Sequence, residues 1–76
     1  MSTVHELIDL AASHFGVDGS GLAPDDDLFA SLGIDSVKAL ELMTELELEW
    51  DIEIPDYELR EVKTFADLAA VCDRRR

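Results

Sequence analysis

Three stretches of the chain carry apolar side chains at every third or fourth position, which is the spacing of one face of an α-helix. The first begins near Thr3, which fits a capping box with Glu6, and ends at Gly16, a residue suited to a left-handed helix stop. The second covers residues 36–50, which contain no glycine or proline. The third starts after Thr64. These stretches predict three main helices.

The segment between the first two helices is rich in turn-forming residues. Residues 16–33 hold all four glycines, Pro24 and three consecutive aspartates, and their apolar members include Leu28, Phe29 and Leu32. We predict a long loop that these three side chains anchor to the core.

A second connection follows the middle helix. Residues 52–54 alternate in polarity like a strand, but no second strand candidate exists to pair with them, so we predict an ordered loop. Pro55 then opens a short helical segment over residues 56–60. The predicted fold class is all-α: a small helical bundle of three main helices plus one short helix, with a long first loop. Residues 1–76 are expected to form a single domain.

Size and charge limit the functions that the chain can serve. A chain of 76 residues buries only about 60% of its unfolded surface, which leaves little room for a large active site. Six Lys and Arg against 18 Asp and Glu give a formal charge of -12, which repels nucleic acid and anionic membranes. The same charge attracts proteins with basic patches. We expect a monomer that meets such partners transiently.

The cysteine count and the N-terminal segment bear on the compartment. Cys72 is the only cysteine, so no internal disulfide and no structural metal site are expected. The N-terminal segment has no basic region followed by an apolar run, and no stretch of 18 apolar residues occurs. These features predict a cytoplasmic protein.

The predicted helix over residues 36–50 has an apolar core face and an opposite, mixed face that also carries apolar residues. The expected core stripe consists of Ala39, Leu42, Met43, Leu46 and Trp50. The opposite side carries Val37, Glu41, Thr44 and Leu48, with Leu40 on the flank. Six acidic residues lie between positions 35 and 51 against Lys38 alone.

The apolar residues on the outer face have two interpretations. They are either ordinary scattered surface residues or a docking strip rimmed by negative charge, which basic enzyme surfaces can bind. The docking hypothesis assigns partner recognition to Asp35, Val37, Lys38, Leu40, Glu41, Thr44, Glu45, Glu47 and Leu48.

Asp35 and Ser36 stand at the start of this helix. A Ser or Asp in that position is most often only a helix cap. The position also places a hydroxyl where free amide hydrogens and the positive end of the helix dipole favour an attached phosphodiester. The residues alone leave both interpretations open.

The chain resembles the acyl carrier protein family, of the freestanding type, over about 40 residues. The resemblance rests on residues 32–37 (Leu-Gly-Ile-Asp-Ser-Val), residues 41–42 (Glu-Leu), Leu46 and residues 51–56 (Asp-Ile-Glu-Ile-Pro-Asp) at matching spacing. It departs at Lys38, where the family often has an acidic or polar residue, and at Trp50, where phenylalanine is usual. Lys38 could therefore influence the choice of partner.

This resemblance implies a function for Ser36. It implies that a separate phosphopantetheinyl transferase uses coenzyme A and Mg²⁺ to attach 4'-phosphopantetheine covalently to Ser36, and that the arm's thiol carries acyl groups as thioesters. The implied partners are an acyl-loading ligase or acyltransferase, synthases and tailoring enzymes with basic docking surfaces. Some members of the family shelter the bound acyl chain between their helices. The resemblance therefore implies a possible acyl-chain pocket here, and its candidate lining residues are Leu40, Met43, Leu59, Val62 and Ala69.

Other functions remain to be weighed against this one. Asp35 before the serine favours a fatty-acid or polyketide type of carrier, and the alternative is an aminoacyl or peptidyl carrier loaded by an adenylating ligase. A different class is an acidic helical adaptor with no arm. An enzyme is not expected, because no activated nucleophile is visible, His5 and His14 both fall on the first helix, and Cys72 fits core packing.

Overall fold

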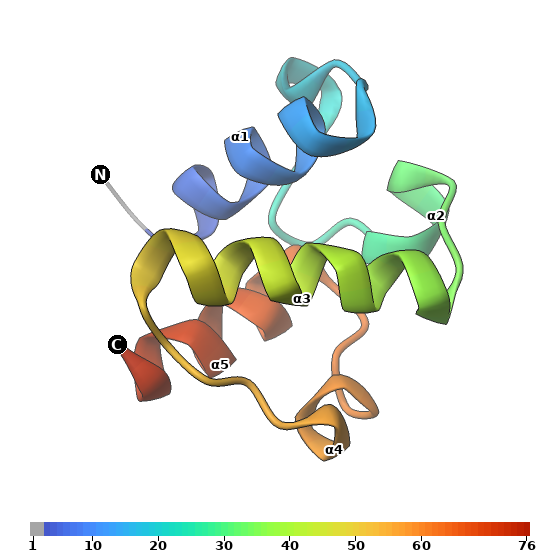
Figure 1. Cartoon of the computed structure of the whole chain (residues 1–76). Helices are drawn as coiled ribbons and strands as arrows, with labels where there is room; N and C mark the ends of the chain where they lie inside the picture. The colour runs from blue at the N-terminus through green and yellow to red at the C-terminus, as the bar shows by residue number, and fades with distance from the viewer. Residues whose placement is uncertain (1–2) are drawn as a thin grey trace.

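The computed structural model describes residues 3–76, so residues 1 and 2 of the predicted domain lie outside the described part. The elements in chain order are α1 (Thr3–Phe15), the 3₁₀ turn η1 (Gly19–Gly21), α2 (Leu28–Leu32), α3 (Ser36–Trp50), α4 (Asp56–Leu59) and α5 (Phe65–Arg75) (Figure 1). Within residues 3–76 no strand forms, and the one isolated β-bridge joins Asp27 to Thr64. The all-α prediction is confirmed.

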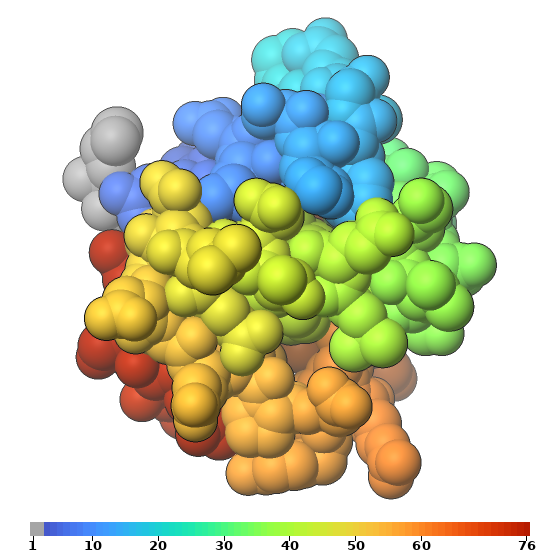
Figure 2. Space-filling model, viewed as in Figure 1, coloured from blue at the N-terminus to red at the C-terminus, as the bar shows by residue number. Residues whose placement is uncertain are grey.

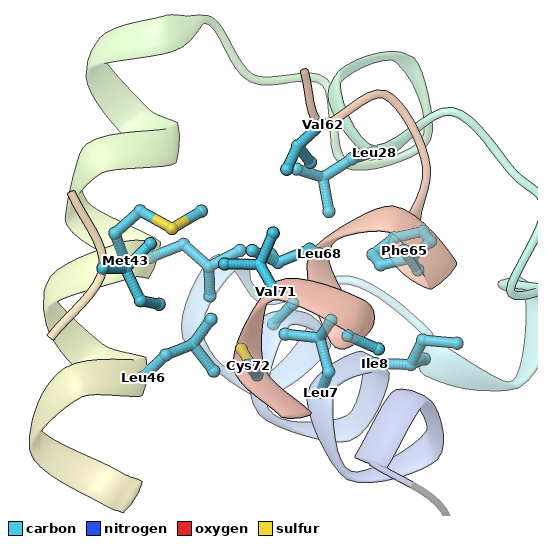
Figure 3. Close-up of a cluster of buried hydrophobic side chains, with 14 of the residues drawn as sticks. Leu7, Ile8, Leu28, Met43, Leu46, Val62, Phe65, Leu68, Val71 and Cys72 are labelled. Carbon is cyan, nitrogen blue, oxygen red and sulfur yellow. The ribbon is translucent and has the colours of Figure 1, made fainter. Parts of the chain in front are cut away.

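The core lies between α1, α3 and α5, as Figure 3 shows for side chains from all three helices. Helix α1 supplies Leu7, Ile8 and Ala11, α3 supplies Leu42, Met43 and Leu46, and α5 supplies Phe65, Leu68 and Cys72. Of the predicted core stripe of α3, only Trp50 differs: it is partly buried and packs against the core, and the Arg76 guanidinium lies over its ring, 4.6 Å from the centroid. The three long amphipathic helices therefore build one shared core.

The start of α1 differs from the expected capping box. Thr3 is already helical, and its hydroxyl bonds to the carboxylate of Asp73 in α5. Glu6 pairs with Arg76 at 3.3 Å instead of reaching back to a cap. The helix nevertheless ends as predicted, because Gly16 has a left-handed backbone with φ of 69°.

The predicted long loop contains a short helix that the sequence pattern missed. The cluster expected only to anchor the loop forms α2, in which Leu28 and Leu32 are buried. The carboxylate of Asp27 caps this helix by accepting from the amide of Ala30 at 2.9 Å. Asp26 accepts from the amide of Ala23 at 2.8 Å, so two of the three consecutive aspartates stabilise the backbone here, one at a helix start and one in a turn. The anchoring itself is confirmed.

Helix α5 begins after Thr64, as predicted, and starts with a capping box. The hydroxyl of Thr64 accepts from the amide of Asp67, and the carboxylate of Asp67 accepts from the amide of Thr64, both at 3.1 Å. Its last turn holds α4 through Glu58, whose carboxylate pairs with Arg75 at 3.0 Å and Arg74 at 3.7 Å. These contacts fix α4 beside the end of α5.

The segment between α3 and α4 is an ordered loop, as predicted. Asp51 turns the chain with a left-handed φ of 52°, and Ile52 and Ile54 are buried. The amide of Ile54 donates to the carboxylate of Glu47 at 3.0 Å. This loop delivers α4 to the side of α3, below it in the view of Figure 1.

Candidate functional site

Ser36 is the first residue of α3 and is exposed to solvent. The chain reaches it through Gly33, which ends α2 in a left-handed conformation with φ of 67°. A β-carbon at Gly33 would meet no atom within 4 Å, so the backbone angle, not lack of space, favours glycine there. The amide of Ile34 then donates to the carbonyl of Phe29 at 3.0 Å, which fixes the approach to Ser36.

Asp35 and Ser36 have different roles at this helix start. Asp35 is the N-cap: its backbone is extended, and its carboxylate accepts from the amide of Lys38 at 3.0 Å. The hydroxyl of Ser36 makes no hydrogen bond within residues 3–76. Ser36 is therefore not needed as the cap, and its oxygen is available for chemistry at the positive end of the helix dipole.

Ser36 also lies in the wall of an open groove of about 380 Å³. The groove is lined by Phe29 from α2, Ser36 and Leu40 from α3, Asp56 and Leu59 from α4, and Arg60 and Val62 from the connection that follows. Its lining is mainly apolar, and the charged residues are Asp56 and Arg60. Two other hollows, of about 280 and 580 Å³, do not include Ser36.

Three of the five residues predicted for an acyl-chain pocket meet in this groove. They are Leu40, Leu59 and Val62. Met43 and Ala69 are not among its lining residues: they are 4% and 5% exposed and belong to the central core. A helical stripe does not distinguish positions that face the core centre from positions that face its edge, so these two assignments are not supported.

The outer face of α3 carries the exposed apolar side chains that the sequence pattern predicted. Val37 is 63%, Leu40 42% and Leu48 75% exposed. Figure 2 shows α3 as a ridge running across one face of the molecule, with α4 below it. We call Val37, Leu40 and Leu48 the α3 strip.

The polar residues assigned to partner recognition divide into two groups. Lys38 and Glu41 form an exposed ion pair at 3.6 Å, Glu45 is exposed, and Thr44 is exposed with its hydroxyl bonded to the carbonyl of Leu40 at 3.1 Å. Asp35 and Glu47 instead hold the fold, as the cap of α3 and as the acceptor for Ile54. The exposed members leave the strip rimmed mostly by negative charge.

Sequence reasoning missed four residues around the groove and the strip. Phe29, Asp56 and Arg60 line the groove, and the side chain of Tyr57 is 62% exposed on α4. A lone arginine inside the acidic run of residues 56–61 was a usable signal for Arg60. The other three depend on how α2 and α4 pack, which periodicity does not reveal.

Cys72 is a buried thiol in the core and plays no part in this site. Burial raises its pKa to about 11, which leaves it almost wholly protonated near neutral pH. The prediction of core packing is confirmed. None of the helices in residues 3–76 has both the length and the apolar character required to span a bilayer.

Comparison with known proteins connects this chain to one family. A family model described as the phosphopantetheine attachment site matches residues 5–72. The acyl carrier protein of Syntrophobacter fumaroxidans is 33% identical over 63 residues, which cover 83% of this chain and 78% of that protein. That of Bdellovibrio bacteriovorus is 31% identical over 67 residues, 88% of this chain and 86% of that protein. That of Clostridium acetobutylicum is 35% identical over 60 residues, which cover 79% of this chain and 78% of that protein.

Proposed function

Because the chain belongs to the acyl carrier protein family, we propose that Ser36 is the residue that carries its 4'-phosphopantetheine arm. The arm is the prosthetic group of this family, and its terminal thiol holds acyl groups as thioesters. The chain is thus an acyl carrier, and its role is to present a bound group to synthase enzymes. The adaptor alternative has no arm and is not supported.

The observation that carries the proposal is that two different residues cap α3 and offer a hydroxyl for attachment. The carboxylate of Asp35 caps the helix, and the hydroxyl of the exposed Ser36 remains without a hydrogen-bond partner within residues 3–76. A phosphodiester on that oxygen would lie beside the free amides of the first turn, where negative charge is favourable. The residues present therefore fit the group.

The attachment needs no catalytic group in this chain. The oxygen of Ser36 forms a bond to the phosphorus next to the pantetheine of coenzyme A, the pyrophosphate bond breaks, and the nucleotide half leaves. The proton of the hydroxyl passes to a base of a separate phosphopantetheinyl transferase. This chain contributes an exposed, unbonded hydroxyl and a negatively charged docking surface.

The proposal is tested by incubating the apo protein with coenzyme A, Mg²⁺ and a broad-specificity phosphopantetheinyl transferase. Intact mass should show one added arm on the wild type and on Ser13→Ala, an exposed serine of α1 that serves as the control. Ser36→Ala should remain unmodified. Modification of Ser36→Ala, or none of the wild type, would overturn the assignment.

The α3 strip is the proposed docking surface for the enzymes that load and use the carrier. Its apolar members are exposed, and six acidic residues against Lys38 surround it between positions 35 and 51. A strip of this kind complements an enzyme surface with an apolar centre and a basic rim. The proposed partners are the transferase, a loading ligase or acyltransferase, synthases and tailoring enzymes.

The proposed cargo is an acyl chain of fatty-acid or polyketide type. Leu40, Leu59 and Val62 give the groove beside Ser36 an apolar lining, which suits a hydrocarbon segment better than a polar aminoacyl group. Amide NMR shifts of the holo and octanoyl forms should differ at these three residues. If they do not respond, the groove does not shelter the chain, and the aminoacyl alternative gains support.

A further inference from the structure

Four of the six positive charges of this acidic chain form ion pairs with carboxylates. Of the six Lys and Arg residues, Lys38 pairs with Glu41, Arg74 and Arg75 pair with Glu58, and Arg76 pairs with Glu6. Two cations remain outside these ion pairs, Arg60 and Lys63.

Lys63 and Arg60 differ in their surroundings. The pKa of Asp67 is lowered mainly by hydrogen bonds from the amides of Lys63 and Thr64, and in smaller part by the charge of Lys63. Lys63 thus acts on a neighbouring carboxylate. Among the cations of residues 3–76, Arg60 alone has no ion pair, side-chain hydrogen bond or such electrostatic partner.

The position of Arg60 gives this unpaired charge a possible role. It is exposed and lines the same groove as Ser36. Asp56 lies in that lining too, yet it forms no ion pair with Arg60. In a chain of formal charge -12, one guanidinium without an ion pair lines the same groove as the reactive hydroxyl.

The chemistry of an arginine side chain is well suited to binding a phosphate. Its planar guanidinium presents several donors that can bond two phosphate oxygens at once, and such charged hydrogen bonds are shorter and stronger than neutral ones. A phosphodiester on Ser36 would bring a negative charge close to Asp35 and Asp56. A nearby cation would offset that repulsion.

We infer that Arg60 binds the phosphodiester that joins the arm to Ser36. This inference rests on the proposed attachment at Ser36. Arg60 is then a positioning residue: by holding the phosphate at the mouth of the groove, it directs the first part of the arm along Leu40 and Leu59. The arm would spend more time against the protein than a freely tumbling tether.

The test compares apo and holo forms of three proteins: the wild type, Arg60→Gln and Lys63→Gln. The Lys63 variant is the matched control, because it removes a cation three residues away that does not line the groove. Intact mass first confirms that each holo protein carries its arm. An unmodified wild type would count against the proposed attachment at Ser36. If all three proteins carry the arm, any difference between them reports on Arg60 alone.

NMR then reports the contact. In the wild type, the side-chain Nε–H resonance of Arg60 should shift between apo and holo forms, and the shift should shrink near 1 M salt, where the Debye length falls to about 3 Å. The ³¹P resonance of holo Arg60→Gln should differ from that of the wild type, and that of Lys63→Gln should not.

A second NMR measurement concerns the arm. Nuclear Overhauser effects between the geminal methyl groups of the arm and the methyl groups of Leu40 or Leu59 should be present in the wild type and in Lys63→Gln, and lost in Arg60→Gln. The inference is overturned if the Arg60 resonance is the same in apo and holo wild type. It is also overturned if that resonance moves only when a carboxylate-bearing cargo is loaded, because the anion would then be the cargo.

Discussion

At the scale of single residues, the account depends on two neighbours that sequence alone could not tell apart. Serine and aspartate are comparably good N-caps, so the Asp35-Ser36 pair left open which side chain closes the helix. The structure assigns the cap to Asp35, because its backbone is extended and Ser36 is already helical. That assignment leaves Ser36 free, which the proposed modification requires.

This division of roles predicts different effects on stability. Asp35→Ala should lower the free energy of unfolding by about 1 kcal/mol, because the amide of Lys38 loses its acceptor. Asp35→Asn should lower it less, since asparagine also caps, and Ser36→Ala should change it by less than about 0.5 kcal/mol. Urea unfolding of the apo proteins measures all three. A cost for Ser36→Ala as large as that for Asp35→Ala would show that the serine is the cap.

At the scale of elements, long periodic helices were predictable and short ones were not. The bounds of α3 were predicted correctly because 15 residues without glycine or proline give four turns of consistent pattern. Helix α2 has five residues, too few to show a period, and its cap lies inside a run of aspartates that resembles a loop. The start of α1 near Thr3 was predicted correctly, but the capping box was not, because the partner of the Thr3 hydroxyl is Asp73, 70 positions away.

The capping box of α5 predicts a pH dependence. Hydrogen bonds from the amides of Lys63 and Thr64 hold the pKa of Asp67 below its ordinary 3.8. A carboxyl group with a depressed folded-state pKa stabilises the fold above its unfolded pKa and loses that effect as pH falls through the folded value. The contribution should therefore be complete well above pH 3.8 and be lost as the pH falls below 3.8 through the folded-state pKa.

Denaturant unfolding between about pH 5 and pH 2 measures this effect. The decrease in unfolding free energy should be smaller for Asp67→Asn than for the wild type, because the variant has no carboxyl group to protonate at the cap. Asp25→Asn, which removes an exposed aspartate of the first loop, is the control and should keep the wild-type slope. Equal slopes for all three proteins would mean that the cap does not couple to pH.

The outer face of α3 makes a prediction for binding. Leu48→Ser should leave stability within about 0.5 kcal/mol, because this side chain is 75% exposed. If it docks against an enzyme, the variant should lose about 1 kcal/mol of interaction, roughly a fivefold rise in KM for the phosphopantetheinyl transferase.

The docking prediction needs a control on another helix. Ala70→Ser on α5 introduces the same hydroxyl at an exposed apolar position away from α3 and should not change KM. If Leu48→Ser also has the wild-type KM, the simpler interpretation is favoured, in which these apolar residues are ordinary surface residues.

At the scale of the whole molecule, fold class and function followed from the sequence, whereas the groove did not. The three amphipathic stretches were enough to predict a helical bundle, and the motif around Ser36 was enough to indicate its family. The groove forms where α2, α3 and the segment around α4 meet, so no single stretch contains its pattern. That is why the sequence did not show which of the five predicted pocket residues line this groove: Leu40, Leu59 and Val62 do, and Met43 and Ala69 lie in the core.

The overall charge of -12 predicts that repulsion between carboxylates destabilises the folded state. Added salt should screen that repulsion and raise the melting temperature, and each kcal/mol gained corresponds to roughly 4–8 °C for a domain of this size. If Mg²⁺ binds the carboxylates, millimolar Mg²⁺ should raise the melting temperature more than NaCl does at the same ionic strength. Melting temperatures that stay constant across both titrations would contradict this prediction.

The most direct test of the account is tandem mass spectrometry of the protein purified from its native host. The account predicts that a peptide containing Ser36 carries the mass of a phosphopantetheine arm, with or without an acyl group, and that fragmentation locates the arm on the Ser36 oxygen. An arm located on another residue, or an unmodified Ser36 in protein that supports its pathway, would contradict the central claim.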